Sequence, residues 1–216
     1  MHIPDGLLPA PVIIGGYALT GLGTWYSLKQ INRRPDPSAE MPRAALLTAA
    51  FFVASSIHIP IPPASVHLVL NGLLGVVLGY YAFPAILIGL FLQAVMFGHG
   101  GLTTLGVNTA MMGGAALLAY ALFQFHTAFK RILPGNQALT VFAFLAGALG
   151  LGIAVLIFAV LTLTTLPADV NPGAERVAIY GLMLAHLPLM VLEGIFTAML
   201  ALFLQRVKPE LLKIGQ

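Results

Sequence analysis

Long apolar runs separated by short polar segments make up almost the whole chain. The runs cover residues 7–28, 44–60, 66–81, 84–97, 102–125, 137–163 and 176–204. Most are close to the ~20 residues that a helix needs to cross the hydrocarbon core of a bilayer. The third and fourth runs are short, so we expect those helices to pack centrally. The pattern predicts an all-α integral membrane bundle of about seven transmembrane helices, forming a single domain over residues 1–216 with no fused accessory domain.

The basic residues are distributed unevenly among the polar segments. All but one of the ten Lys and Arg residues fall at one predicted end of the bundle (Lys29, Arg33, Arg34, Arg43, Lys130, Arg131, Arg206, Lys208 and Lys213). Only Arg176 falls at the other end. Because basic residues are retained on the cytoplasmic side, we expect the N-terminus outside and the C-terminus in the cytoplasm. The first run has no basic residue before it and is not read as a cleaved signal peptide.

Composition agrees with a membrane protein and narrows its chemistry. Hydrophobic residues make up 59% of the chain and charged residues only 8%, against about 25% charged in soluble domains. The net charge of +3 therefore concerns topology and lipid headgroups, and we expect no nucleic-acid partner. The chain has no cysteine, which leaves nitrogen, oxygen and thioether groups as metal ligands. It has no Walker-type glycine-lysine loop, so we expect that the chain cannot hydrolyse ATP by itself.

The first two residues can chelate a metal ion. The Met1 amine, the deprotonated His2 amide and His2 Nδ1 can close a five-membered and a six-membered ring around one ion. Methionine removal generally needs a small second residue, so Met1 is expected to remain. A plane of three nitrogens suits Ni(II) or Cu(II) and penalises tetrahedral Zn(II). Residues 1–6 are therefore a candidate metal-binding segment that needs a fourth ligand.

Several polar residues from other runs are expected at the same outer surface. His67, predicted at the start of a helix in the turn that contains Ser65, is the preferred fourth ligand, and His58 is its competitor. His99 lies in a glycine-rich turn and Asn108 can hydrogen-bond a ligand imidazole. Together with Ser65, these two residues are candidates for supporting the metal ligands.

Polar residues also interrupt the apolar runs. His186 and Glu193 are about two helical turns apart and share a face. Ionisable groups at membrane depth are functional candidates, and the alternative is hydrogen bonding within the bundle. Asn71 and Gln93 are expected to be structural, and small residues at 146–150 should allow close helix contact.

Three motifs together resemble the CbiM/NikM family. They are MHIPDG at residues 1–6, SVHLVLNGLLG at 65–75 and HGGLTTLGVN at 99–108. These proteins are the substrate-binding S components of energy-coupling factor (ECF) transporters for cobalt and nickel. The resemblance implies a seven-helix S component that holds the metal through the Met1 amine, the His2 amide and imidazole, and the His67 imidazole.

The resemblance also implies where the protein works and with what. Its partners would be a transmembrane coupling (T) component, paired ABC ATPases and a small accessory membrane component in the inner (plasma) membrane of a prokaryote. Ni(II) or Co(II) would be the transported substrate and no catalytic cofactor is expected. Nickel is favoured, because planar nitrogen binds it with the higher intrinsic affinity. CbiM-like chains often begin MHIMEG, and this chain departs at Pro4 and Asp5.

Two other classes of function are compatible with the motifs. An intramembrane metalloenzyme could use the terminal chelate, but it would need a nearby acid or base. Asp5 is the only nearby carboxylate and is expected to belong to a Pro-Asp-Gly turn. A structural subunit is the third possibility, and it leaves the outer histidines unexplained.

Overall fold

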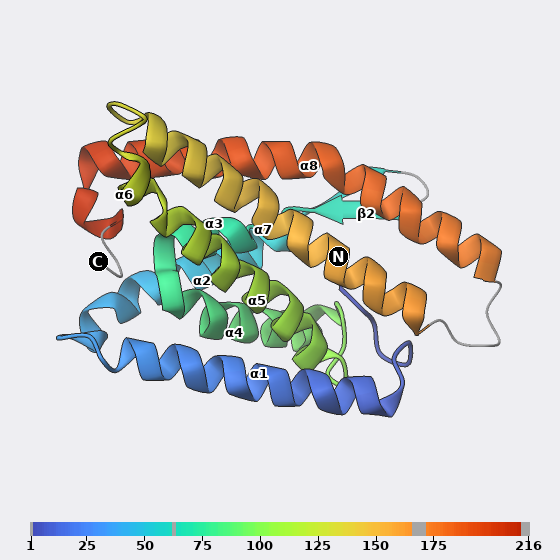
Figure 1. The fold of residues 1–216 in the computed structure, drawn as a ribbon. Helices are drawn as coiled ribbons and strands as arrows, with labels where there is room; N and C mark the ends of the chain where they lie inside the picture. Colours follow the sequence, from blue (N-terminus) through green and yellow to red (C-terminus); the bar gives the residue numbers. More distant parts are fainter. Residues whose placement is uncertain (1, 62–63, 166–171, 213–216) are drawn as a thin grey trace.

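The computed structural model describes residues 2–61, 64–165 and 172–212, and helices dominate it (Figure 1). The α-helices are α1 (Ala10–Ile31), α2 (Met41–Ser55), α3 (Asn71–Leu78), α4 (Ala82–Phe97), α5 (Leu105–Gln124), α6 (His126–Phe129), α7 (Gln137–Thr164) and α8 (Pro172–Val207). Short 3-10 turns lie at η1 (Pro37–Glu40), η2 (Gly79–Tyr81) and η3 (Pro209–Leu212). Two short strands, β1 (His58–Ile61) and β2 (Ala64–His67), pair with each other. The predicted helical character is confirmed.

The helices have the length and surface of a membrane protein. Within the described residues, 4 helical stretches are long and apolar enough to cross a bilayer: Asn71–Phe97, Leu105–Phe129, Gln137–Thr164 and Gly173–Val207. Their outward faces and that of α1 carry large exposed apolar side chains, such as Ile14 at 68% and Leu184 at 65% exposure. An apolar surface of this extent needs a non-aqueous environment, which a bilayer supplies.

The connection between α2 and α3 differs from the prediction. A helix was expected from residue 66, but β1 and β2 form an antiparallel ribbon in which His58 lies opposite His67, and α3 begins only at Asn71. The prediction that a helix begins at residue 66 is therefore wrong, although the chain as described is mostly helical. Prolines at positions 60, 62 and 63 cannot continue a helix, and the β-branched residues around them favour extended backbone.

α3 lies at the centre of the bundle, as expected for a short helix shielded by its neighbours. All its residues are buried. A Cβ at Gly72 would lie 2.8 Å from the Gly147 Cα, and one at Gly150 would lie 2.7 Å from the Gly72 Cα. Asn71 Nδ2 donates a hydrogen bond to the Gly150 carbonyl at 2.9 Å. The small residues at 146–150 thus allow α3 and α7 to touch through their backbones, and Asn71 is structural as predicted.

α3 and α4 meet at a sharp break. Gly79 has φ +56°, a left-handed conformation that glycine adopts at little cost. The Tyr81 hydroxyl donates to the Pro37 carbonyl at 2.6 Å, which places this break beside the segment that follows α1. Elsewhere in the bundle, Gln93 of α4 donates to the Ser55 hydroxyl of α2, so it links two helices as expected.

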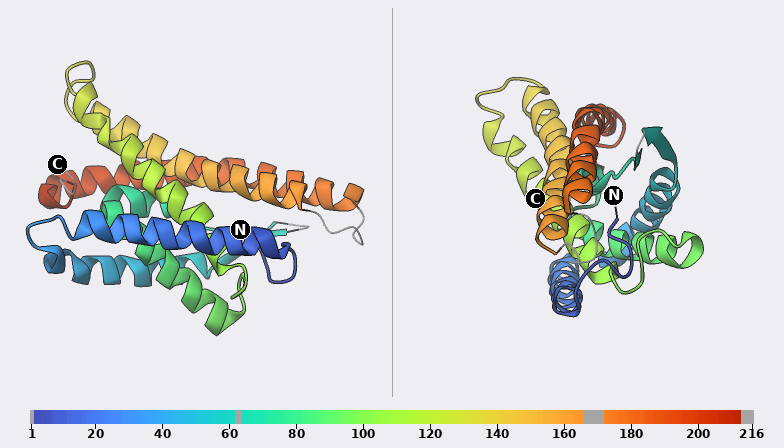
Figure 2. Two further views of the ribbon diagram at one scale, coloured as in Figure 1. Left: turned by 60° about the horizontal axis from the view of Figure 1, so that its bottom comes forward. Right: turned by 90° about the vertical axis from the view of Figure 1, so that its right-hand side faces the viewer.

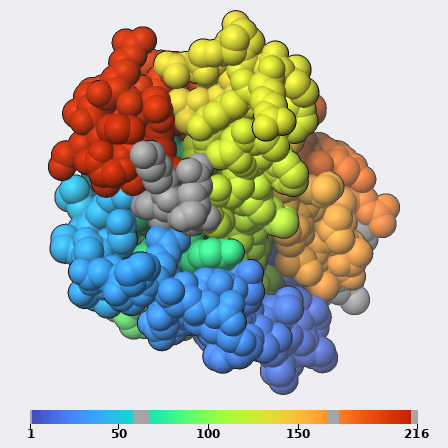
Figure 3. All heavy atoms as spheres, turned by 60° about the vertical axis from the view of Figure 1, so that its left-hand side comes forward, coloured from blue at the N-terminus to red at the C-terminus, as the bar shows by residue number. Residues whose placement is uncertain are grey.

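The segments that carry basic residues lie at one end of the molecule. Figure 3 turns this end toward the viewer, and residues around 30–50, 125–140 and 200–212 make up most of it. The end of α7 and the start of α8, which carries Arg176, lie at the opposite end (Figures 1 and 2). Lys213 lies outside the described residues.

Candidate metal centre

The N-terminal segment turns back from α1 into the bundle, where a side chain of α5 holds its backbone. Ile3 is fully buried and Asn108 is 2% exposed. The Ile3 amide donates to Asn108 Oδ1 at 2.9 Å, and Asn108 Nδ2 donates to the Ile3 carbonyl at 3.0 Å. The Thr104 hydroxyl donates to the same carbonyl at 2.7 Å. Asn108 thus pairs with the Ile3 backbone as a neighbouring β-strand would, and fixes the position of His2.

The Asp5 side chain attaches the N-terminal segment to the bundle at a second point. It lies in a turn with Gly6, whose φ is +84°, in agreement with the predicted Pro-Asp-Gly turn. Its Oδ1 accepts hydrogen bonds from the Thr103 amide at 3.0 Å, the Thr103 hydroxyl at 2.5 Å and the Thr104 amide at 3.3 Å. These bonds, led by the one from the Thr103 hydroxyl, lower the pKa of the Asp5 carboxyl. The charged form therefore anchors the segment at the start of α5.

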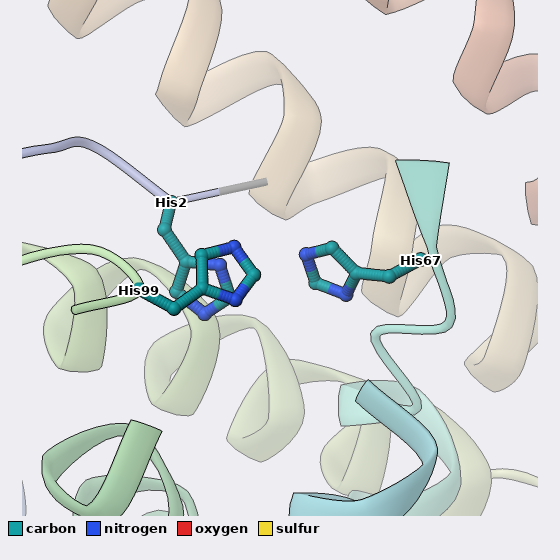
Figure 4. A group of neighbouring side chains, drawn as sticks. All are labelled: His2, His67 and His99. Carbon is teal, nitrogen blue, oxygen red and sulfur yellow. The ribbon is translucent and has the colours of Figure 1, made fainter. Parts of the chain in front are cut away.

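Three histidines from separate parts of the chain meet beside the anchored segment. His2 comes from the N-terminal segment, His67 from the end of β2, and His99 from the turn between α4 and α5. One ring nitrogen from each lies within 4.8 Å of the others. Figure 4 shows the His67 ring pointing toward His2 and His99 from the opposite side. His67 is 1% exposed, whereas the other two are partly exposed.

The three imidazole rings already lie against one another in stacked, tilted and edge-to-face arrangements. The ring centroids of His2 and His67 are 5.0 Å apart with 20° between the planes, and those of His2 and His99 are 4.3 Å apart. Neighbouring nitrogens bound to one ion at about 2.0 Å each are about 2.8 Å apart in a plane of four ligands and about 3.5 Å apart in a trigonal plane. The cluster would therefore have to close by about 1.3–2 Å to hold an ion.

Main-chain contact orients the His67 ring. Its Nδ1 lies 3.0 Å from the Leu68 carbonyl oxygen, so the neutral ring donates from Nδ1 and carries its lone pair on Nε2. Metal-bound histidines commonly donate their second nitrogen to a carbonyl in this way. The ring is thereby prepared to offer Nε2 as a ligand.

A cavity of about 420 Å³ lies next to the cluster and is lined by Ser56, Phe97, Gly98 and His99. His99 belongs to both the cavity and the cluster. It therefore stands where an ion coming from the cavity would first meet an imidazole.

The structure separates the residues that sequence reasoning grouped together. His2, His67 and His99 converge, whereas Asn108 binds the Ile3 backbone and makes no hydrogen bond to an imidazole among the contacts described. Ser65 lies in β2 opposite Pro60, and Met1 lies outside the described residues. The attachments made by Asp5 and by Thr104 were not anticipated, although Thr104 lies inside the HGGLTTLGVN motif.

His186 makes its described bond within its own helix, with Nδ1 2.8 Å from the Leu182 carbonyl oxygen. It does not belong to the cluster of described histidines.

Comparison with known proteins relates this chain to metal transport proteins. Residues 2–211 match the family CbiM, described as a cobalt uptake substrate-specific transmembrane region. A putative metal transport protein of Haemophilus influenzae is 33% identical over 213 residues, which cover 98% of this chain and 97% of that protein. The fused nickel transport protein NikMN of Rhodobacter capsulatus is 34% identical over 226 residues, which cover 98% of this chain but 64% of that protein.

The fold is also similar to that of a solved structure. The crystal structure of a truncated transition metal transporter superposes with a TM-score of 0.80 at 25% identity, covering 95% of this chain and 99% of that one. The family match covers nearly the whole chain, including each of the three converging histidines, and we conclude that this protein belongs to the CbiM family of membrane components for cobalt and nickel transport.

Proposed function

We propose that this protein is the substrate-binding S component of an ECF-type importer and captures Ni(II) or Co(II) at its extracytoplasmic face for ATP-driven uptake. The observation that carries the proposal is the convergence of His2, His67 and His99 beside a buried, anchored N-terminal segment. Transport, rather than chemistry, is supported by the relatives, which are named as metal transport proteins.

The proposed ligands are four nitrogens in one plane. They are the Met1 amine, the deprotonated amide and Nδ1 of His2, and Nε2 of His67. The Asn108–Ile3 pairing supports this set because it holds the residue next to His2 by its main chain. His99 would receive the ion from the adjacent cavity and, with Ser65 and Asn108, support the ligands.

This geometry favours nickel. Planar nitrogen ligands suit Ni(II) better than Co(II), and they penalise Zn(II), which prefers a tetrahedron. Cu(II) is expected to bind at least as tightly as Ni(II), since the affinity order peaks at copper. Buried Ile3 and half-buried Leu68 would limit water at the remaining positions of the ion.

The metalloenzyme alternative is less well supported. It requires an acid or base near the metal. The Asp5 carboxylate instead accepts hydrogen bonds from Thr103 and Thr104.

We further propose seven membrane crossings with the basic end in the cytoplasm, as the positive-inside rule requires. Transport would then need a T component, paired ABC ATPases and an accessory membrane component in the plasma membrane of a prokaryote. The fused NikMN relative, of which this chain spans 64%, supports the expectation that further parts are needed.

The test is to block the terminal amine. A protein extended by one residue before Met1 should stay folded but lose high-affinity Ni(II) binding, measured by calorimetry and by the absorption spectrum of the planar complex. The matched control is the same extended protein after protease removal of the added residue, which should bind again. Undiminished Ni(II) affinity in the extended protein would contradict the chelate.

A further inference from the structure

Glu193 lies inside α8, within the stretch that is long and apolar enough to cross a bilayer, and binds the backbone that follows His67. Its side chain is 1% exposed. Oε1 accepts a hydrogen bond from the Val69 amide at 2.5 Å, and Oε2 accepts one from the Leu70 amide at 3.0 Å. The two amides are consecutive and come from more than 120 positions earlier in the chain, so the contact joins two distant elements.

This contact stabilises a backbone conformation that is otherwise unfavourable. Leu70 has φ +54°, the only positive φ among the described residues other than glycine. A left-handed residue with a side chain costs roughly 1–2 kcal/mol. In this turn two successive amides point to the same carboxyl group, an arrangement that binds anions. Without Glu193 both amides would be buried without their described acceptor, at a further cost.

The same turn determines where His67 lies. Only Leu68 separates His67 from Val69, so the first amide bound by Glu193 lies two residues after the proposed ligand His67. On the other side of the turn, Asn71 binds the Gly150 carbonyl of α7. The segment that carries His67 is thus attached to both α7 and α8, which pack against each other along most of their lengths (Figure 2).

We infer that Glu193 is a positioning residue for the metal site: by holding the Val69 and Leu70 amides it keeps the His67 imidazole in the plane of the other nitrogens. The inference rests on the proposed function. It also links α8 to the ligand, so a shift of α8 against α3 would move His67 away from His2.

The test is Glu193→Gln, which keeps the shape of the side chain but replaces one acceptor oxygen with an NH2 group. That group faces an amide donor, so at least one of the two bonds is lost. We expect Ni(II) to dissociate roughly tenfold faster or more, with a shifted absorption band because His67 leaves the plane. Glu193→Asp keeps the carboxyl group but is one methylene shorter. Its Ni(II) dissociation rate should lie between that of Glu193→Gln and that of the unchanged protein.

A control separates positioning from general loss of stability. Thr197, one turn further along α8, is also buried and bonds only the Glu193 carbonyl of its own helix among the contacts described. Whatever the change in melting temperature, the Ni(II) spectrum and dissociation rate of Thr197→Val should equal those of the unchanged protein. A folded Glu193→Gln protein with an unaltered spectrum and dissociation rate would overturn the inference.

Hydrogen exchange in the unchanged protein gives a test that no folding defect can affect. The Val69 and Leu70 amides should exchange slowly with and without Ni(II), and rapid exchange in the folded protein would also overturn the inference. The results that would refute the role of Glu193 differ from those that would refute the proposed chelate. If the N-terminal extension leaves Ni(II) binding intact, the proposed chelate fails; if the extension abolishes binding but Glu193→Gln changes nothing, only the role of Glu193 fails.

Discussion

Asn108→Ala is expected to weaken metal binding strongly although Asn108 makes no described contact with the three imidazoles. The substitution removes both hydrogen bonds between Asn108 and the Ile3 backbone, at 2.9 and 3.0 Å. The Ile3 amide then loses its described acceptor in a fully buried position, which costs about 1–3 kcal/mol. The Ile3 carbonyl keeps its bond from Thr104, so losing the second bond costs only about 0.5–1.5 kcal/mol.

The summed penalty of about 1.5–4.5 kcal/mol falls on the docking of the N-terminal segment. Because that segment carries His2, the same free energy is lost from metal binding. At 1.4 kcal/mol for each factor of ten, the Kd for Ni(II) should rise by about 10- to 1,600-fold. The helical bundle itself should keep its melting temperature within a few degrees, because the described bonds of the Asn108 side chain go to the N-terminal segment and to Thr104.

Calorimetric titration of the purified protein with Ni(II) measures the Kd, and hydrogen exchange over residues 2–9 measures whether the N-terminal segment has left the bundle. Thr127→Ala is the control, because Thr127 is an exposed threonine after α5 that bonds the Gln124 carbonyl at 2.9 Å. An Asn108→Ala protein with normal Kd and a still protected segment would refute the reasoning.

Three further predictions concern the cluster, the anchor and the core. His67→Ala should abolish most Ni(II) binding in calorimetry, whereas His126→Ala, at the other end of the bundle, should not. The pKa of Asp5 is lower in the folded protein than in the unfolded chain, so its hydrogen bonds add stability above the unfolded pKa. That stability is lost as the pH falls through the folded pKa, and the hydrogen-exchange protection of the N-terminal segment should drop in acid. Asp5→Asn should remove this pH-dependent drop. Gly147→Leu should lower the melting temperature by several degrees, because even a Cβ there would lie 2.7 Å from a backbone oxygen of α8. A melting temperature equal to that of the unchanged protein would show that α7 and α8 can move apart at no cost.

Most helices could be predicted because lipid and protein interior both require apolar side chains. The predicted run 137–163 nearly coincides with Gln137–Thr164, and 102–125 with Leu105–Gln124. The extended backbone before α3 could not be predicted in the same way. A short apolar run is compatible with strand or helix. The turn just before α3 also contains a contact that the local sequence does not reveal, because the Leu70 amide bonds Glu193, 123 residues away.

The histidines of the candidate site could be named from the sequence, but the hydrogen bonds around them could not. Histidine is readily recognised as a metal ligand, so His2 and His67 were identified from their types and positions. Asn108 illustrates the limit. A side-chain amide can bond an imidazole or a peptide group equally well, and its partner depends on how a segment 105 residues away docks.

The lengths of α7 and α8 have a consequence for how the protein sits in its membrane. α8 has 36 residues and is therefore about 54 Å long, while the hydrocarbon core of a bilayer is about 30 Å thick. Even a tilt of 40°, the upper end of the usual range, leaves it spanning about 41 Å. The mismatch cannot be absorbed by tilting, so part of α8 must stand in the headgroup layer or in water, with its partner α7 beside it. The end of this pair that carries Arg176 extends past α1 (Figure 2), so a protein approaching this end of the bundle would meet these two helices first.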